Sequence, residues 1–126
     1  MKKIAIVTGS RRGIGLAIVK KLMSDGYTAV LCDVVEEPEV KGLLDELNKT
    51  GEACYFRCDI SKPADRDALF DAVLEKYGRI DVLVNNAGVT RAVRLNILET
   101  TPESSERLMR INCEGTFFLC QTAANK

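Results

Sequence analysis

The fold of this 126-residue chain is decided by one stretch, Thr8-Gly9-Ser10-Arg11-Arg12-Gly13-Ile14-Gly15. A short β-branched apolar run, residues 3–8, leads into it. The segment that follows, residues 14–25, repeats apolar side chains at helical spacing, at Ile14, Ile18 and Leu22. A glycine-rich turn between a strand and a helix presents unpaired N–H groups and partial positive charge to an anion. The stretch therefore predicts a turn that holds the diphosphate of a dinucleotide.

Each glycine of the turn has a predicted role. Gly9 allows a tight turn, Gly13 lets the backbone approach a diphosphate, and Gly15 lets the helix pack close to the strand. The alternative is an ordinary glycine-rich turn, but the position between a strand and a helix favours the binding role. The candidate cofactor-binding residues of the turn are Gly9, Ser10, Arg11, Arg12, Gly13, Ile14 and Gly15.

Asp33 bears on the choice between NAD and NADP. It ends the second apolar run, eighteen residues after Gly15. A carboxylate there accepts hydrogen bonds from the adenosine ribose hydroxyls and repels a 2′-phosphate. Arg12 supports the opposite choice, because a guanidinium in the glycine turn pairs well with a phosphate. The predicted cofactor is NAD, with NADP as the disfavoured alternative, and a solvated aspartate at a strand end is the non-functional alternative.

Strand-like and helix-like segments alternate along the chain. Four such strands separated by helices predict an α/β fold, a Rossmann-type doubly wound parallel sheet in the order 3-2-1-4. Ligands bind at the carboxyl ends of the strands, at the switch point between strands 1 and 4. The predicted strands are 3–8, 28–33, 53–58 and 80–85. The first two predicted helices are residues 14–25 and 39–50. The third has Ser61 as its N-cap and stops at Gly78. A loop at 88–100 follows the fourth strand, and the fourth helix begins after it at Pro102.

Composition excludes several classes of function. Formal net charge is zero, which gives no reason to expect nucleic acid or an anionic membrane as a partner. No apolar run suits a signal peptide or a membrane span, so we expect a cytoplasmic protein. The chain has no histidine, which removes Ser-His-Asp and Cys-His catalysis. Its five cysteines lack metal-binding spacing, so we expect free thiols and no metal site.

Three further segments, together with the glycine turn, resemble the short-chain dehydrogenase/reductase family over the whole chain. They are Cys58-Asp59-Ile60, Asn85-Asn86-Ala87-Gly88 and Ile111-Asn112-Cys113-Glu114-Gly115-Thr116-Phe117. The resemblance implies an NAD(P)-dependent oxidoreductase that transfers hydride between nicotinamide and an alcohol or carbonyl. It implies adenine contacts at Asp59 and Ile60, cofactor contacts at Asn86, Ala87 and Gly88, and a catalytic role for Asn112, which bends its helix and holds a water.

Each of these residues also has a reading from its own chemistry. Asp59 can accept a hydrogen bond from the adenine amino group or cap the next helix. The Asn86 amide can bridge neighbouring backbone groups, and Gly88 leaves room for the cofactor ribose. Asn112 lies in a helix, where asparagine is a poor former, so it has either a specific role or a satisfied place on the helix face. Residues 91–98 look most like 3-oxoacyl carrier-protein reductases or sugar and polyol dehydrogenases.

The serine, tyrosine and lysine of the family's catalytic tetrad have no counterpart here. Four residues after Tyr27, Tyr55 and Tyr77 stand Leu31, Asp59 and Asp81, so no Tyr-x-x-x-Lys is present. We expect residues 1–126 to be an NAD(P)-binding Rossmann domain that stops before that segment and lacks turnover alone. The full-length protein is expected to be a homo-oligomer. The alternatives are a self-standing, non-catalytic nucleotide-binding module and a Rossmann-like methyltransferase, against which Asn85 to Gly88 and Asn112 argue.

Overall fold

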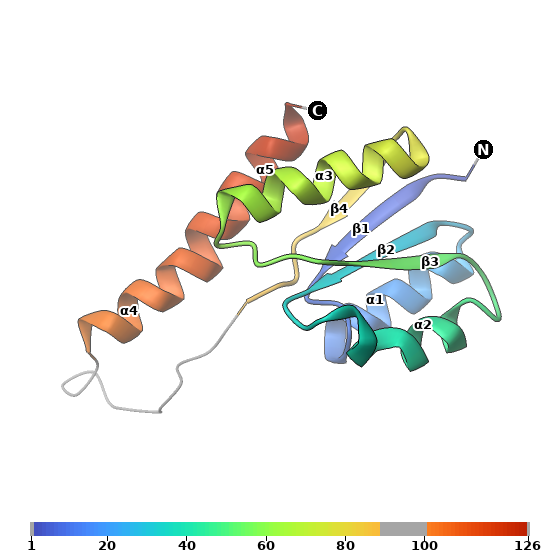
Figure 1. The fold of residues 1–126 in the computed structure, drawn as a ribbon, viewed down its shortest axis with the longest axis horizontal. Helices are drawn as coiled ribbons and strands as arrows, with labels where there is room; N and C mark the ends of the chain where they lie inside the picture. The colour runs from blue at the N-terminus through green and yellow to red at the C-terminus, as the bar shows by residue number, and fades with distance from the viewer. Residues whose placement is uncertain (1, 89–100, 126) are drawn as a thin grey trace.

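The computed structural model describes residues 2–88 and 101–125 and contains one four-stranded parallel sheet (Figure 1). Its strands are β1 (Ile4–Thr8), β2 (Thr28–Asp33), β3 (Ala53–Arg57) and β4 (Val82–Val84). Their order is β3-β2-β1-β4, which confirms the predicted doubly wound α/β fold. In the register, Val7 of β1 lies beside Leu31 of β2 and Val84 of β4. The switch point lies between β1 and β4, so the glycine turn leaves the sheet next to the end of β4.

Helices cover both faces of this sheet (Figure 1). On one face lie α1 (Gly13–Ser24), the 3₁₀ turn η1 (Glu37–Val40) and α2 (Lys41–Leu47). On the other lie α3 (Pro63–Tyr77) and α5 (Thr116–Ala124). The last helical stretch is continuous from α4 (Pro102–Leu108) through a π-helical segment, η2 (Met109–Gly115), into α5. The predicted loop at 88–100, apart from Gly88, lies outside the described residues.

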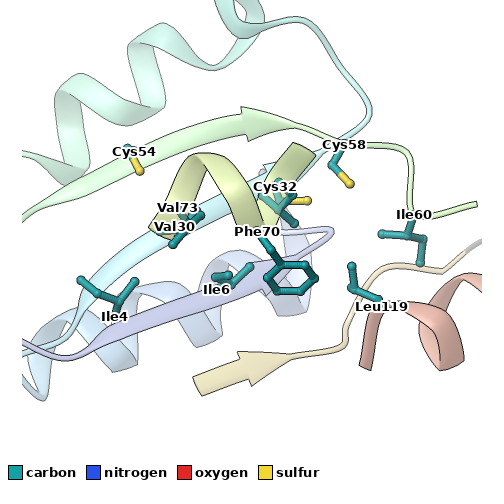
Figure 2. Close-up of a cluster of buried hydrophobic side chains, with 11 residues drawn as sticks. Ile4, Ile6, Val30, Cys32, Cys54, Cys58, Ile60, Phe70, Val73 and Leu119 are labelled. Atoms are coloured by element: carbon teal, nitrogen blue, oxygen red, sulfur yellow. The ribbon is translucent and has the colours of Figure 1, made fainter. Parts of the chain in front are cut away.

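Two apolar clusters hold the layers together. Alternate side chains of a strand point to opposite faces, so neighbouring β1 residues Ile6 and Val7 enter different clusters. Ile6 packs with Phe70 of α3 and Leu119 of α5, all fully buried (Figure 2). Val7 packs with α1 and α2 residues in the other cluster. Because both faces are covered, β1 is buried along its whole length, as parallel strands of this class are.

Two local features need comment, and the second corrects a prediction. Ile14, which shares the helical spacing of Ile18 and Leu22 and is a candidate cofactor-binding residue, is 75% exposed. The face of α1 that meets the sheet is instead centred on Gly15 and Val19. Ser61 does not cap α3, because the N-cap is Lys62 and no side chain caps it. Ser61 donates from its backbone N–H and its hydroxyl to Asp59 Oδ1, so the carboxylate organises the turn before the helix.

A buried arginine joins the turn after β3 to the last helix. Arg66 of α3 is only 7% exposed, and its Nη1 donates to the Ile60 carbonyl oxygen at 2.7 Å. The guanidinium also lies 5.3 Å from the centre of the Phe118 ring, a cation–π distance. A Cβ at Gly115 would lie 2.8 Å from the same Ile60 oxygen. The Ile60 carbonyl is therefore fixed from α3, while η2 approaches it closely at Gly115.

Candidate dinucleotide-binding site

The glycine turn adopts the backbone that its sequence predicts. Gly9 and Gly13 both have φ of +63°, in the left-handed region that favours glycine. A Cβ at Gly13 would meet nothing within 4 Å, so this position faces open space where a ligand can approach the backbone. A Cβ at Gly15 would lie 2.4 Å from the Gly9 carbonyl oxygen. Gly15 thus allows close packing of the helix against the turn itself, whereas the sequence predicts close packing against the strand.

The N-terminus of α1 is suited to an anion. Its N-cap is Arg12, whose side chain makes no capping hydrogen bond, and the first turn holds no acidic residue. The first N–H groups of a helix have no partners within the helix. Together with the helix dipole they attract negative charge. The turn and the helix start therefore combine backbone that a ligand can approach, partial positive charge and the exposed Arg12 at one place.

A buried hydroxyl ties the start of the turn to the end of β4. Thr8 is fully buried, and its Oγ1 accepts the backbone N–H of Asn86 at 3.1 Å and that of Ala87 at 2.9 Å. The same Oγ1 donates to the Val84 carbonyl oxygen at 3.4 Å. The Asn86 amide donates to the Gly9 carbonyl oxygen at 3.0 Å. Asn86 thus bridges backbone groups as its sequence position suggests, while the role of Thr8 was missed.

Ser10 faces the protein interior. It is fully buried, its hydroxyl donates to the Val7 carbonyl oxygen at 2.7 Å, and it accepts the Cys32 N–H at 3.1 Å. The Ser10 side chain, predicted to bind the cofactor, is therefore engaged in fixing the turn to β2. The backbone N–H of Ser10 also donates to β2, to the Cys32 carbonyl oxygen at 3.3 Å.

Asp33 lies against the glycine turn, at the end of β2. Its Oδ2 accepts the Arg11 N–H at 3.4 Å and lies 3.8 Å from Arg11 Nε. Its Oδ1 accepts the Val34 N–H at 2.8 Å. Among the described residues, the buried Arg11 Nε has no hydrogen-bond partner, since Asp33 Oδ2 at 3.8 Å is too far away to be one. Buried polar groups are nearly always paired, so this orphaned donor is suited to the acceptor oxygen of a ligand.

One pocket of about 330 Å³ collects six of the predicted residues: Gly9, Asp33, Asp59, Ile60, Ala87 and Gly88. This volume falls within the range of about 300–1,000 Å³ that is usual for small-molecule sites. Its remaining lining residues are Cys32, Val34, Cys58, Arg107 and Ile111. Arg107 and Ile111 come from α4 and η2 and were missed, because nothing in the local sequence shows that this helix reaches the ends of β2 and β3.

The charge of Asp59 is stabilised within its own turn. Burial alone would raise the pKa of Asp59, but hydrogen bonds from the Ser61 hydroxyl and N–H, aided by Lys62 and Arg57, outweigh it and lower the pKa. The Asp59 N–H donates to Asp65 Oδ2 at 2.9 Å. Asp59 therefore has the turn-organising role, and as a pocket residue it is also available to an adenine.

Asn112 and Gly88 lie next to each other. A Cβ at Gly88 would approach Asn112 Oδ1 to 3.0 Å. The Asn112 side chain therefore lies on one side of Gly88, while Gly88 also lines the pocket. Asn112 stands in the π-helical segment η2, which agrees with the predicted helix irregularity. Segments of this kind occur often at functional sites.

The cysteines are free thiols, as predicted. Cys32 and Cys58 are buried in the pocket wall. The neighbouring Cys58 thiol is the main cause that raises the pKa of the Cys32 thiol, and burial is the second cause. Within residues 2–88 and 101–125, no three His, Cys, Asp or Glu side chains are grouped to hold a metal ion. In the same part of the chain, no helix has the length and apolar character needed to cross a bilayer.

A second cavity, of about 570 Å³, lies between α3, β4 and α5. It is lined by Leu74, Ile80 and Leu83 among others and contains none of the predicted site residues. Although it is larger, it lies away from the glycine turn. The smaller pocket is therefore the candidate site, because it joins the turn, Asp33 and the ends of three strands.

Known proteins of one family are similar to this chain. The family model described as short chain dehydrogenase matches residues 3–126. A diacetyl reductase [(S)-acetoin forming] of Staphylococcus epidermidis is 37% identical over 126 residues, covering all of this chain and 48% of the relative. An L-2,3-butanediol dehydrogenase of Corynebacterium glutamicum is 34% identical over 128 residues, covering all of this chain and 49% of the relative.

One solved structure is also similar to this chain. The 3-oxoacyl-[acyl-carrier protein] reductase of Brucella melitensis, in complex with NAD, superposes with a TM-score of 0.93 at 33% identity. The match covers 99% of this chain and 49% of that one. The chain therefore spans about half the length of these relatives.

Proposed function

Because this chain belongs to the short-chain dehydrogenase/reductase family, we propose that it is the cofactor-binding half of an NAD-dependent oxidoreductase. The observation that carries the proposal is the meeting of Asp33 and the glycine turn at one pocket. The orphaned Arg11 Nε and the open space at Gly13 support a ligand rich in acceptor oxygens at this place.

The residues present fit a dinucleotide. The backbone from Gly9 to Gly15 and the start of α1 would hold the diphosphate. The Asp33 carboxylate would accept hydrogen bonds from the adenosine ribose hydroxyls. Asp59 and Ile60 would line the adenine side, with Ala87 and Gly88 along the ribose. Bound nicotinamide supplies or accepts a hydride; the chain's part is to bind and orient it.

For the whole protein we propose a small alcohol or carbonyl compound as substrate. Two of the relatives are a diacetyl reductase and a 2,3-butanediol dehydrogenase by name, which supports this class. Homo-oligomer formation and a cytoplasmic location remain predictions, the latter supported by five free thiols, which suit a reducing compartment.

The preference for NAD is tested by Asp33→Asn. Loss of the carboxylate charge weakens the hydrogen bonds to the ribose and removes the repulsion of a 2′-phosphate. We expect about tenfold weaker NADH binding, from the difference between charged and neutral hydrogen bonds, and tighter NADPH binding. Isothermal titration calorimetry with both cofactors measures the ratio.

Asp45→Asn is the matched control, because it removes one negative charge from an exposed position on α2. It should leave both dissociation constants unchanged. Tighter binding of NADPH than NADH by the unaltered chain would refute the role given to Asp33 and favour Arg12. Absence of binding for both cofactors would refute the proposed function itself.

The competing proposal is a self-standing, non-catalytic nucleotide-binding module, which would bind the dinucleotide without any hydride transfer by the whole protein. For these 126 residues we expect no measurable NADH formation from a panel of small alcohols, because no Tyr-x-x-x-Lys is present to act as base. Absorbance at 340 nm checks this, with a complete short-chain dehydrogenase assayed in parallel. Turnover above the background of heat-denatured chain would contradict the assignment of Asn112 as the single tetrad residue present.

A further inference from the structure

The loop that carries Asp33 is fastened to the neighbouring strand at three successive carbonyl groups. Tyr55 of β3 shares its hydroxyl proton between the carbonyl oxygens of Asp33, at 3.0 Å, and Val35, at 2.5 Å. Arg57, two residues further along β3, donates from Nε to the carbonyl oxygen of Val34 at 3.1 Å. No local sequence pattern requires these contacts, which join residues 20 to 23 positions apart.

Arg57 also connects the two walls of the candidate pocket. Its Nε lies 3.2 Å from Glu36 Oε1, on the loop after β2. Its Nη1 lies 3.9 Å from Asp65 Oδ2, the atom that accepts the Asp59 N–H. These pairs are partly exposed, and such pairs stabilise a fold only weakly. Their effect is geometric, since one guanidinium contacts both the Asp33 side and the Asp59 side.

The orientation of the Asp33 carboxylate depends on this loop backbone. Its Oδ1 accepts the N–H of Val34, whose own carbonyl is held by Arg57. The carbonyls on either side of Val34 are held by Tyr55, a side chain only 6% exposed. Burial is the main cause that raises the pKa of Tyr55 to about 12, so its hydroxyl keeps the donated proton at neutral pH.

We propose that Tyr55 and Arg57 are positioning residues for cofactor specificity: they fix the loop at 33–35 so that the Asp33 carboxylate faces the ribose 2′ position. The inference rests on the proposed function and deepens it. Neither side chain lines the pocket, so each acts through Asp33. A carboxylate held in one direction accepts hydrogen bonds from the ribose hydroxyls well and repels a 2′-phosphate strongly. A carboxylate that rotates freely forms weaker hydrogen bonds to the ribose and repels the 2′-phosphate less.

The test is Tyr55→Phe, which removes one oxygen and keeps the buried ring. NADH should bind about three- to tenfold more weakly, the usual cost of a lost hydrogen bond, while NADPH binds equally well or more tightly. Arg57→Lys is the second variant and keeps the positive charge. It loses the planar fork, so we expect the same direction of change, by about threefold.

Tyr77→Phe is the matched control. Its hydroxyl also makes a hydrogen bond, to Cys54 Sγ at 3.3 Å, but Tyr77 has no contact with the loop at 33–36 among the described hydrogen bonds. It should leave the NADH-to-NADPH ratio of dissociation constants unchanged. Equal weakening of both cofactors by Tyr55→Phe would show a merely structural role and overturn the inference.

The outcomes separate the inference from the proposed function. Binding of NADH by the unaltered chain, with a ratio that neither Tyr55→Phe nor Arg57→Lys changes, overturns the inference alone. If Tyr55→Phe fails to fold by far-UV circular dichroism, Arg57→Lys decides the question. Failure of the unaltered chain to bind any dinucleotide overturns both.

Discussion

Replacement of Gly15 by alanine is expected to lower the free energy of unfolding by about 3 kcal/mol, near the upper end for overpacked sites. The new Cβ would lie 2.4 Å from the Gly9 carbonyl oxygen, 2.6 Å from Asn86 Nδ2 and 2.9 Å from Ser10 Cα. Two of these atoms belong to backbone that the turn cannot move without losing its shape. Urea denaturation followed by circular dichroism measures the loss, and NADH binding should fall with it.

Gly42→Ala is the matched control for this prediction. Gly42 lies within α2, and a Cβ there would meet nothing within 4 Å. Alanine is the better helix former, so this variant should be more stable by about 0.5–1 kcal/mol. Equal stability of Gly15→Ala and the unaltered chain would contradict the close packing of α1 on the turn.

Replacement of Thr8 by valine is expected to cost about 2–4 kcal/mol of unfolding free energy. The two side chains have nearly the same shape, but valine accepts no hydrogen bond. The N–H groups of the half-buried Asn86 and Ala87 would both lose their acceptor, and each donor left without a partner costs about 1–2 kcal/mol, in the lower part of the range for buried groups. Chemical denaturation measures the stability, and amide hydrogen exchange at residues 86 and 87 should rise.

Thr8→Ser separates the hydroxyl from the methyl group. It keeps the acceptor for both N–H groups and removes one buried carbon, so it should cost only about 1 kcal/mol. If Thr8→Ser and Thr8→Val lose the same free energy, the hydroxyl is not what joins the end of β4 to the glycine turn.

The sequence predicts the site to the extent that its features are local. The turn from Gly9 to Gly15 shows itself through three glycines between a strand and a helix, and Asp33 through its place after a buried run. The exposure of Ile14 does not follow from its helical spacing, because that spacing gives a face of the helix but not where this face first meets the sheet. Ser61 was misassigned because Asp59, two residues before it, accepts both of its donors.

The sequence by itself determined two things. The strand order follows from the alternation of strands and helices, because right-handed βαβ connections in a doubly wound sheet lead to the order 3-2-1-4. The backbone of the glycine turn follows from the local pattern of glycines between a strand and a helix. Only the tertiary structure decided which polar groups meet there. Thr8 contacts residues 78 and 79 positions away, and Tyr55 reaches the loop of Asp33 from another strand. Such pairings depend on how the strands lie side by side, because hydrogen bonds need atoms within about 3 Å whatever their separation along the chain.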